Sequence, residues 1–205
     1  MISGIVLGAG ASKRMGAPKQ RMMLARKPML ERVLDVFAQS SLDETVLVIN
    51  PVLGWKGGRR ARLRVVFNTR SREGISTSVK AGIDALDRRS EAAVIGLADK
   101  PLLRTSTIES LLDTYRRTNA QIVLPVFRGI RGNPILFRRD LFQHLRRLKG
   151  DVGAKVLIES NKYSVAEVPV NDAGVLLDVD TPDDLRRARR MVLARSALRK
   201  RKARK

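Results

Sequence analysis

A glycine-rich, cationic loop follows the first mostly apolar run of the sequence. Residues 2–7 lead into Gly8-Ala-Gly-Ala-Ser-Lys-Arg-Met-Gly-Ala-Pro-Lys19, which carries the cations Lys13, Arg14 and Lys19. Glycines let the main chain approach an anion and present N–H groups to it, while Lys and Arg neutralise phosphate charge. The loop therefore indicates binding of a polyphosphate such as a nucleoside triphosphate.

Two familiar glycine motifs do not fit this loop. A dinucleotide-binding fingerprint needs a third glycine where Lys13 stands and an acid where Asn50 closes the second expected strand. A P-loop needs Gly-Lys-Ser/Thr, but Gly16 is followed by Ala17. The loop is thus a phosphate-binding candidate outside both motifs.

Carboxylates follow two other expected strands. Asp99 stands before Lys100 and Pro101, where it could be a hard-cation ligand or equally a turn or capping aspartate. Asp178 and Asp180 flank Val179 near the end of the chain, and because they alternate along an extended segment at most one can point into a given site. We expect a metal site built from Asp99 and one of this pair.

A helix start follows directly. Thr181 is placed as the N-cap and Pro182 as the first helical residue. Asp183 and Asp184 then lie in the first turn, where negative charge is favourable, so we expect them to stabilise the helix.

The elements that must position these residues alternate between strand and helix patterns. This alternation predicts an α/β domain, a Rossmann-like three-layer sandwich whose mostly parallel sheet has helices on both faces. Ligands of such sheets bind beyond the carboxyl ends of the strands. The expected strands are 2–7, 45–49, 64–67, 93–97, 121–126, 135–137, 164–168 and 175–179, and the expected helices are 29–37, 76–86, 105–115, 140–148 and one through Leu185, Ala188 and Val192.

Composition excludes several kinds of chemistry. The 205 residues contain no cysteine and one histidine, His144. A disulfide framework, a thiolate metal site and a cysteine nucleophile are excluded, and a histidine-based triad would depend on that one residue. There is neither an apolar stretch of membrane-spanning length nor a signal-peptide pattern, so we expect a cytoplasmic protein.

The net charge of +21 is unevenly distributed, since residues 186–205 contain eleven of the 41 basic residues and no acid. We expect one domain over residues 1–194 and a basic, flexible tail over 195–205. Such a surface attracts polyanions without specificity, so nucleic acid is not expected as a specific partner. A basic binding or accessory protein remains an alternative to an enzyme.

Six sequence blocks resemble those of the MobA-like nucleotidyltransferases, and nearest among them the molybdenum cofactor cytidylyltransferase branch. They occur in the family's order between residues 5 and 185. The first is the loop from Leu7 to Lys19, similar to Leu-Ala-Ala-Gly-x-Ser-x-Arg-Met-Gly-x-x-Lys. The others are Asn68 through Gly74 to Ser78, Ala98-Asp-Lys-Pro101, Gly132-Asn-Pro-Ile-Leu-Phe137, Gly150-Asp-Val-Gly-Ala-Lys155 and Asp178-Val-Asp-Thr-Pro-Asp-Asp-Leu185.

The resemblance implies a fold like that of nucleotide-diphospho-sugar transferases and a magnesium-dependent reaction, with manganese as a substitute. A nucleoside monophosphate, CMP from CTP, would pass to a phosphorylated acceptor, molybdopterin, with release of pyrophosphate. A molybdoenzyme would be the client for the product. A guanylyltransferase using GTP, or a sugar- or polyol-phosphate nucleotidyltransferase, is the alternative within the fold.

The resemblance also assigns roles. Arg14, Lys19 and Asp99 would be catalytic, and Asp99 and Asp180 would bind the metal, Asp180 being preferred because it directly precedes Thr-Pro. The nucleotide would contact Leu7, Gly8, Ala9, Gly10, Arg14, Lys19, Asn68, Gly74 and Ser78, and the acceptor would contact Asn133, Pro134, Asp151 and Lys155. Two departures stand out, because Lys100 replaces the family's glutamine and Asn133 replaces a histidine. Lys100 could reach a phosphate or point outward.

Overall fold

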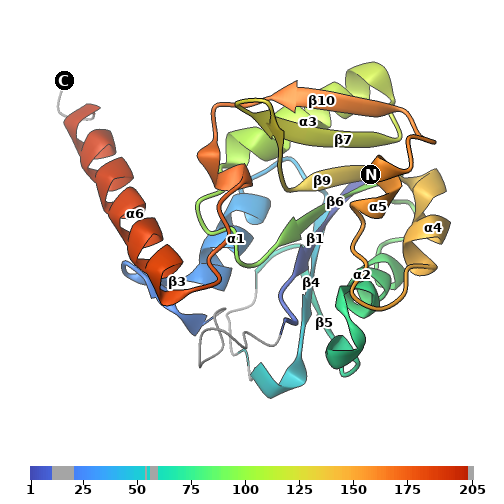
Figure 1. Cartoon of the computed structure of the whole chain (residues 1–205), viewed down its shortest axis with the longest axis horizontal. Coiled ribbons are helices and arrows are strands. Elements are labelled where there is room, and N and C mark those ends of the chain that lie inside the picture. Colours follow the sequence, from blue (N-terminus) through green and yellow to red (C-terminus); the bar gives the residue numbers. More distant parts are fainter. Residues whose placement is uncertain (11–20, 54, 56–59, 203–205) are drawn as a thin grey trace.

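The sheet is built around strand β1 (Ile2–Leu7), all six residues of which are buried. A computed structural model describes residues 1–10, 21–53, 55 and 60–202 of the chain (Figure 1). Within this part the main sheet has the order β10-β7-β9-β6-β1-β4-β5, with β8 paired to β7. The remaining strands are β4 (Glu44–Ile49), β5 (Leu63–Phe67), β6 (Ala92–Leu97), β7 (Ile122–Phe127), β8 (Ile130–Arg131), β9 (Ile135–Arg138) and β10 (Val165–Pro169).

Strand direction gathers the loops of interest at one edge. The pairs β1–β4, β1–β6, β4–β5 and β7–β10 are parallel. Strand β9 runs antiparallel to both β6 and β7. The carboxyl ends of the parallel strands and the start of β9 therefore lie together. The predicted mostly parallel sheet is confirmed.

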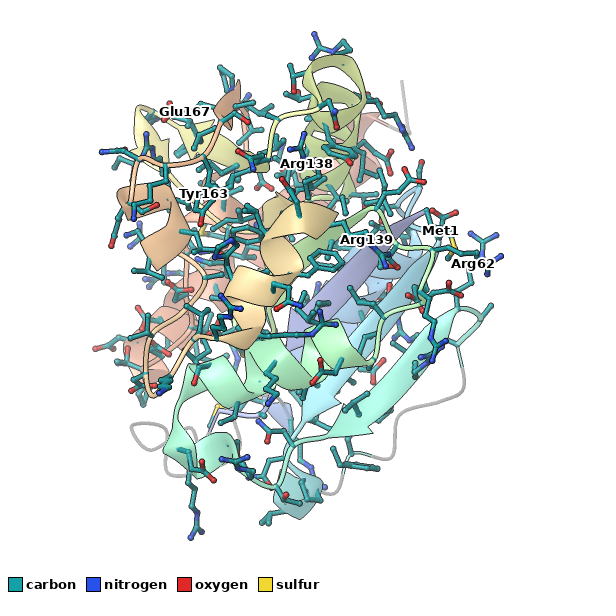
Figure 2. The ribbon with its side chains drawn as sticks, turned by 90° about the vertical axis from the view of Figure 1, so that its right-hand side faces the viewer. Met1, Arg62, Arg138, Arg139, Tyr163 and Glu167 are labelled. Atoms are coloured by element: carbon teal, nitrogen blue, oxygen red, sulfur yellow. The ribbon has the colours of Figure 1, made fainter. Side chains whose placement is uncertain are left out.

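Helices cover both faces, which confirms the predicted three layers. One face carries α1 (Met29–Ala38) and α3 (Thr105–Thr118), whose apolar residues share a core with Val6, Leu47 and Val94. The other carries α2 (Ile75–Asp84), α4 (Phe142–Arg146) and α5 (Val156–Glu159). Figure 2 looks onto α2 and α4, which cross this face of the sheet.

The last helix, α6 (Pro182–Lys202), starts as predicted. The Thr181 hydroxyl accepts the Asp184 N–H at 3.2 Å, and the Asp184 carboxylate accepts the Thr181 N–H at 2.9 Å. This reciprocal cap fixes the helix start directly after Asp180. The first half of α6 packs on the hairpin of β2 (Met23–Leu24) and β3 (Lys27–Pro28), and the helix then extends away from the body (Figure 1). Its backbone is helical through Lys202, and the flexible tail at 195–205 stays a prediction.

The predicted strand at 175–179 is wrong. A short 3₁₀ turn, η6 (Ala173–Val175), is followed by an extended segment without a partner strand. The Asp172 carboxylate starts the turn by accepting the Gly174 N–H at 3.0 Å. Gly174 lies so close to the Leu102 carbonyl that a Cβ would be 2.4 Å from it. The segment is therefore held by the β6–α3 loop instead of by a strand ladder.

Helix boundaries differ less. The predicted helix 140–148 is shorter, because a 3₁₀ turn, η5 (Arg139–Leu141), precedes α4. Elements of two to four residues, namely β2, β3, β8, α5, η3 (Pro51–Leu53) and η4 (Ser71–Glu73), were not expected, since such lengths are too short for a periodic pattern. Among the described residues, no helix combines the length and apolarity needed to cross a bilayer.

Asp172 also caps α3 from a distance of 65 residues or more in sequence, and its removal is expected to destabilise the fold. Its carboxylate accepts the Arg104 N–H and the Thr107 hydroxyl, each at 2.8 Å. We expect D172A to lower the free energy of unfolding by about 3 kcal/mol, since buried donors lose their acceptor. Urea denaturation measures this loss. The exposed Asp113 of α3 supplies the control, because D113A should change it by less than about 0.5 kcal/mol; equal effects would contradict the prediction.

Candidate active site

The strands of the central sheet end at one level. The Gly8 N–H donates to Val48 O at 2.8 Å, and the Ala98 N–H donates to Leu7 O at 3.0 Å. Chain segments that follow β1 and β6 are thereby held side by side. Leu7, Gly8, Ala9 and Gly10 stand at this edge directly before the cationic part of the loop, whose Lys13, Arg14 and Lys19 lie outside the described residues.

Asp99 lies next to the segment that carries the second predicted metal ligand. The Val179 N–H donates to the backbone oxygen of Asp99 at 3.0 Å. The Asp178 carboxylate lies close enough to Asp99 and to Asp180 for their charges to raise its pKa. The structure thus places Asp99, near the middle of the chain, next to residues 178–180 near its end.

Lys100 points inward and pairs with Asp178. Its side chain is 4% exposed, and its Nζ lies 2.7 Å from Asp178 Oδ1. Burial raises the pKa of the Asp178 carboxyl, while the hydrogen bond from Lys100 acts in the opposite direction. The outward orientation, one of the two expected for Lys100, is not found, because the side chain is buried against Asp178; contact with a phosphate stays a prediction.

The donor set at this edge suits a hard divalent cation that also binds substrate. Within the described ranges, no three acidic, histidine or cysteine side chains converge to form a protein-only metal cage. Carboxylates from Asp99 and Asp180 would supply two oxygen ligands, and Mg²⁺ typically completes its shell with phosphate oxygens and water. The residues present therefore fit such an ion.

Asn68 organises the loop between β5 and α2. Its Nδ2 donates to Thr77 Oγ1 and to Ser78 Oγ, each at 2.9 Å, and its Oδ1 accepts the Arg70 N–H at 2.9 Å. The side chain is buried, and its amide is occupied within the loop. Asn68 and Ser78 are thus brought together, and Asn68 fixes the start of α2.

Gly74 ties this loop to the predicted acceptor segment. Its φ of 118° is rare for residues with a side chain, and a Cβ there would be 2.1 Å from the backbone oxygen of Gly150. That oxygen accepts the Ser76 N–H at 3.2 Å, and Asp151 Oδ1 accepts the Ile75 N–H at 3.3 Å. Gly150 and Asp151 therefore cap α2, and the two loops form one unit.

A cavity of about 600 Å³ joins the two sides of the site. Leu7 and Leu97 contribute strand ends, Ile75 and Val79 contribute α2, and Asn133 and Lys155 contribute the acceptor side. Pro134 stands beside Gly96 in β6. The walls are mostly apolar with a few polar groups, as in many small-molecule sites.

Sequence reasoning missed two features of this region. Arg131 lines the cavity and pairs with Glu167 of edge strand β10 at 2.7 Å; Glu167 is labelled in Figure 2. Arg131 directly precedes the Gly132-Asn-Pro block, and this position was the signal that could have identified it. The other is the Lys100–Asp178 pair. His144 of α4, the single histidine, packs against Tyr163, with the two ring centroids 5.6 Å apart. Tyr163 is labelled in Figure 2.

Residues 4–168 match the family model described as the MobA-like NTP transferase domain. The chain belongs to the MobA-like NTP transferase family. The match covers the sheet from β1 into β10 and five of the six blocks, and it confirms the resemblance. The block from Asp178 to Leu185 lies beyond the matched residues.

Relatives of known name agree with this membership. The molybdenum cofactor cytidylyltransferase of Escherichia coli K12 is 29% identical over 89% of this chain and 93% of its own length. The purine catabolism protein PucB of Bacillus subtilis 168 is 30% identical over 91% of this chain and 95% of its own. The manganese complex of Rv0371C from Mycobacterium tuberculosis H37Rv is 29% identical, with a TM-score of 0.76, over 91% of this chain and 96% of that chain.

The Gly74–Gly150 approach gives a test of the coupled loops. We expect G74A to lower the free energy of unfolding by more than about 2 kcal/mol, because the added Cβ meets backbone that cannot move cheaply. G129A is the matched control, since Gly129 also has a positive φ, 79°, but open space around a Cβ. Thermal unfolding of both variants measures the difference. Equal losses would show that backbone strain alone matters.

Proposed function

We propose that this MobA-like protein is a magnesium-dependent nucleotidyltransferase that transfers CMP from CTP to a phosphorylated acceptor, molybdopterin, and releases pyrophosphate. The observation that carries the proposal is the cavity that connects Leu7, on the nucleotide side, with Asn133 and Lys155, on the acceptor side. Leu97, which also lines the cavity, ends β6 two residues before Asp99. We therefore place both substrates next to the proposed metal ligands Asp99 and Asp180.

The reaction requires no side-chain nucleophile. An acceptor phosphate oxygen forms a bond to the α-phosphorus, and the bond from that phosphorus to the bridging oxygen of pyrophosphate breaks, so pyrophosphate leaves with the electron pair. Alignment and cationic stabilisation are what the protein must supply. This mechanism requires neither a cysteine nor a histidine, so it is compatible with a chain that has no cysteine and one histidine.

The residues divide these tasks. Leu7 to Gly10 would line the base and ribose, and Gly74 and Ser78 would close over the nucleotide from α2. Arg14 and Lys19 would hold the β- and γ-phosphates. Asp99 and Asp180 would hold Mg²⁺ or Mn²⁺, which when bound neutralises phosphate charge.

The acceptor side is assigned from the cavity wall. Lys155 is exposed and lines the cavity, so it would meet an acceptor phosphate. Asn133 and Pro134 would contact the body of the acceptor. Asp151 has a structural role on this side, because its carboxylate caps α2. The choice of molybdopterin is supported by the E. coli relative, whose name states the molybdenum cofactor and the cytidylyl group.

Purified protein tests the proposal directly. It is incubated with each nucleoside triphosphate, Mg²⁺ and molybdopterin, and pyrophosphate release and the mass of the pterin product are measured. We expect release with CTP and a cytosine dinucleotide of the pterin. Release with GTP alone would identify a guanylyltransferase. Nucleotide binding without release would reject molybdopterin as the acceptor.

Replacing the proposed metal ligand should affect turnover more than binding. We expect D99N to lower kcat at least about a hundredfold while CTP affinity changes less, because the carboxylate acts mainly on the charge that develops in the transition state. D113N on the exposed side of α3 is the control. Wild-type turnover of D99N with Mg²⁺ present would reject this role.

A further inference from the structure

Lys100 places a cationic side chain in the protein interior, where cations are rarely found. Its side chain is 4% exposed, and the backbone on both sides is held by turns, with Lys100 N donating to Leu97 O at 3.3 Å and Leu103 N donating to Lys100 O at 3.2 Å. Lysine is almost never fully buried unless it is paired. Its place in the fold therefore requires a compensating negative charge.

Asp178 supplies that charge and reaches Lys100 across 78 residues of sequence. The Nζ–Oδ1 distance of 2.7 Å is that of a charge-assisted hydrogen bond. One residue further on, the Val179 N–H donates to Asp99 O. The two segments are thus joined by an ion pair and a backbone hydrogen bond, and Asp180 follows directly.

We propose that Lys100 is a positioning residue that binds Asp178, removes that carboxylate from the metal ligands, and leaves Asp99 and Asp180 to hold the divalent ion. The inference rests on the metal site of the proposed function. It goes beyond that function by naming the residue that selects between two adjacent aspartates. It agrees with the observation that no three carboxylates among the described residues form a metal cage.

Charge balance makes the proposal measurable. Lys100 and Asp178 carry opposite unit charges next to the ion site, so the pair adds no net charge there. Removing only one partner leaves an uncompensated charge beside a divalent cation, which should change its affinity by about tenfold or more. Removing both restores the balance.

Manganese binding to the full chain, without nucleotide, provides the test, read by electron paramagnetic resonance of free Mn²⁺. We expect D178N to bind Mn²⁺ about tenfold more weakly than the wild type, because the unpaired Lys100 repels the ion. We expect K100M/D178N to bind within about threefold of the wild type. A double variant that stays at least tenfold weak would show that Asp178 is itself a metal ligand and would overturn the proposal.

Two controls keep the outcome decisive. Thermal unfolding checks each variant, and because D178N buries an unpaired ammonium it is the one expected to lose stability; the double variant, in which neither position 100 nor position 178 is charged, then decides alone. D180N in the double background should abolish Mn²⁺ binding. Unchanged binding there would overturn Asp180 as a ligand, and Lys100's role with it, while the pyrophosphate assay would still decide the transferase activity.

Discussion

The docking of residues 172–180 onto the loop between β6 and α3 is the constraint on which the site depends. Asp172 caps α3, Gly174 meets the backbone of Leu102, and Val179 bonds to Asp99. None of these contacts belongs to a helix or a strand ladder. They hold a late, irregular segment against the end of a central strand. Residues 178–180 therefore lie next to Asp99, although the two segments belong to different parts of the chain.

On the opposite side of the site, the β5–α2 loop is held against Gly150 and Asp151. There Asn68 closes the β5–α2 loop, because its amide donates a hydrogen bond to Thr77 of α2. The Gly150 oxygen and the Asp151 carboxylate accept N–H groups at the start of α2. Side chains and main chain together thus fix the residues near the proposed nucleotide. The mostly apolar cavity is lined by Ile75 and Val79 of α2 and by Asn133 and Lys155 of the proposed acceptor side.

Much of the fold follows from local patterns, and much of the site does not. The buried run of β1 and the Thr181 cap of α6 are recorded in neighbouring residues, and both are found as predicted. The predicted strand at 175–179 was wrong because an apolar run does not show whether a neighbouring strand is available to pair with it. The orientation of Lys100 was undecidable from sequence, since its partner is 78 residues away.

The strand order bears on how the chain assembles as it is synthesised. Strands β1, β4, β5 and β6, which neighbour one another in the sheet, are complete by Leu97. The first half of the chain can therefore form a contiguous parallel unit early, carrying Leu7 to Gly10 and Asn68 to Ser78. The cap of α3 and both candidate partners of Asp99 arrive only with residues 172–180. Under the proposed function, a nascent chain holds the nucleotide side of the site before it can complete the metal side, which forms only after residues 172–180 have been translated.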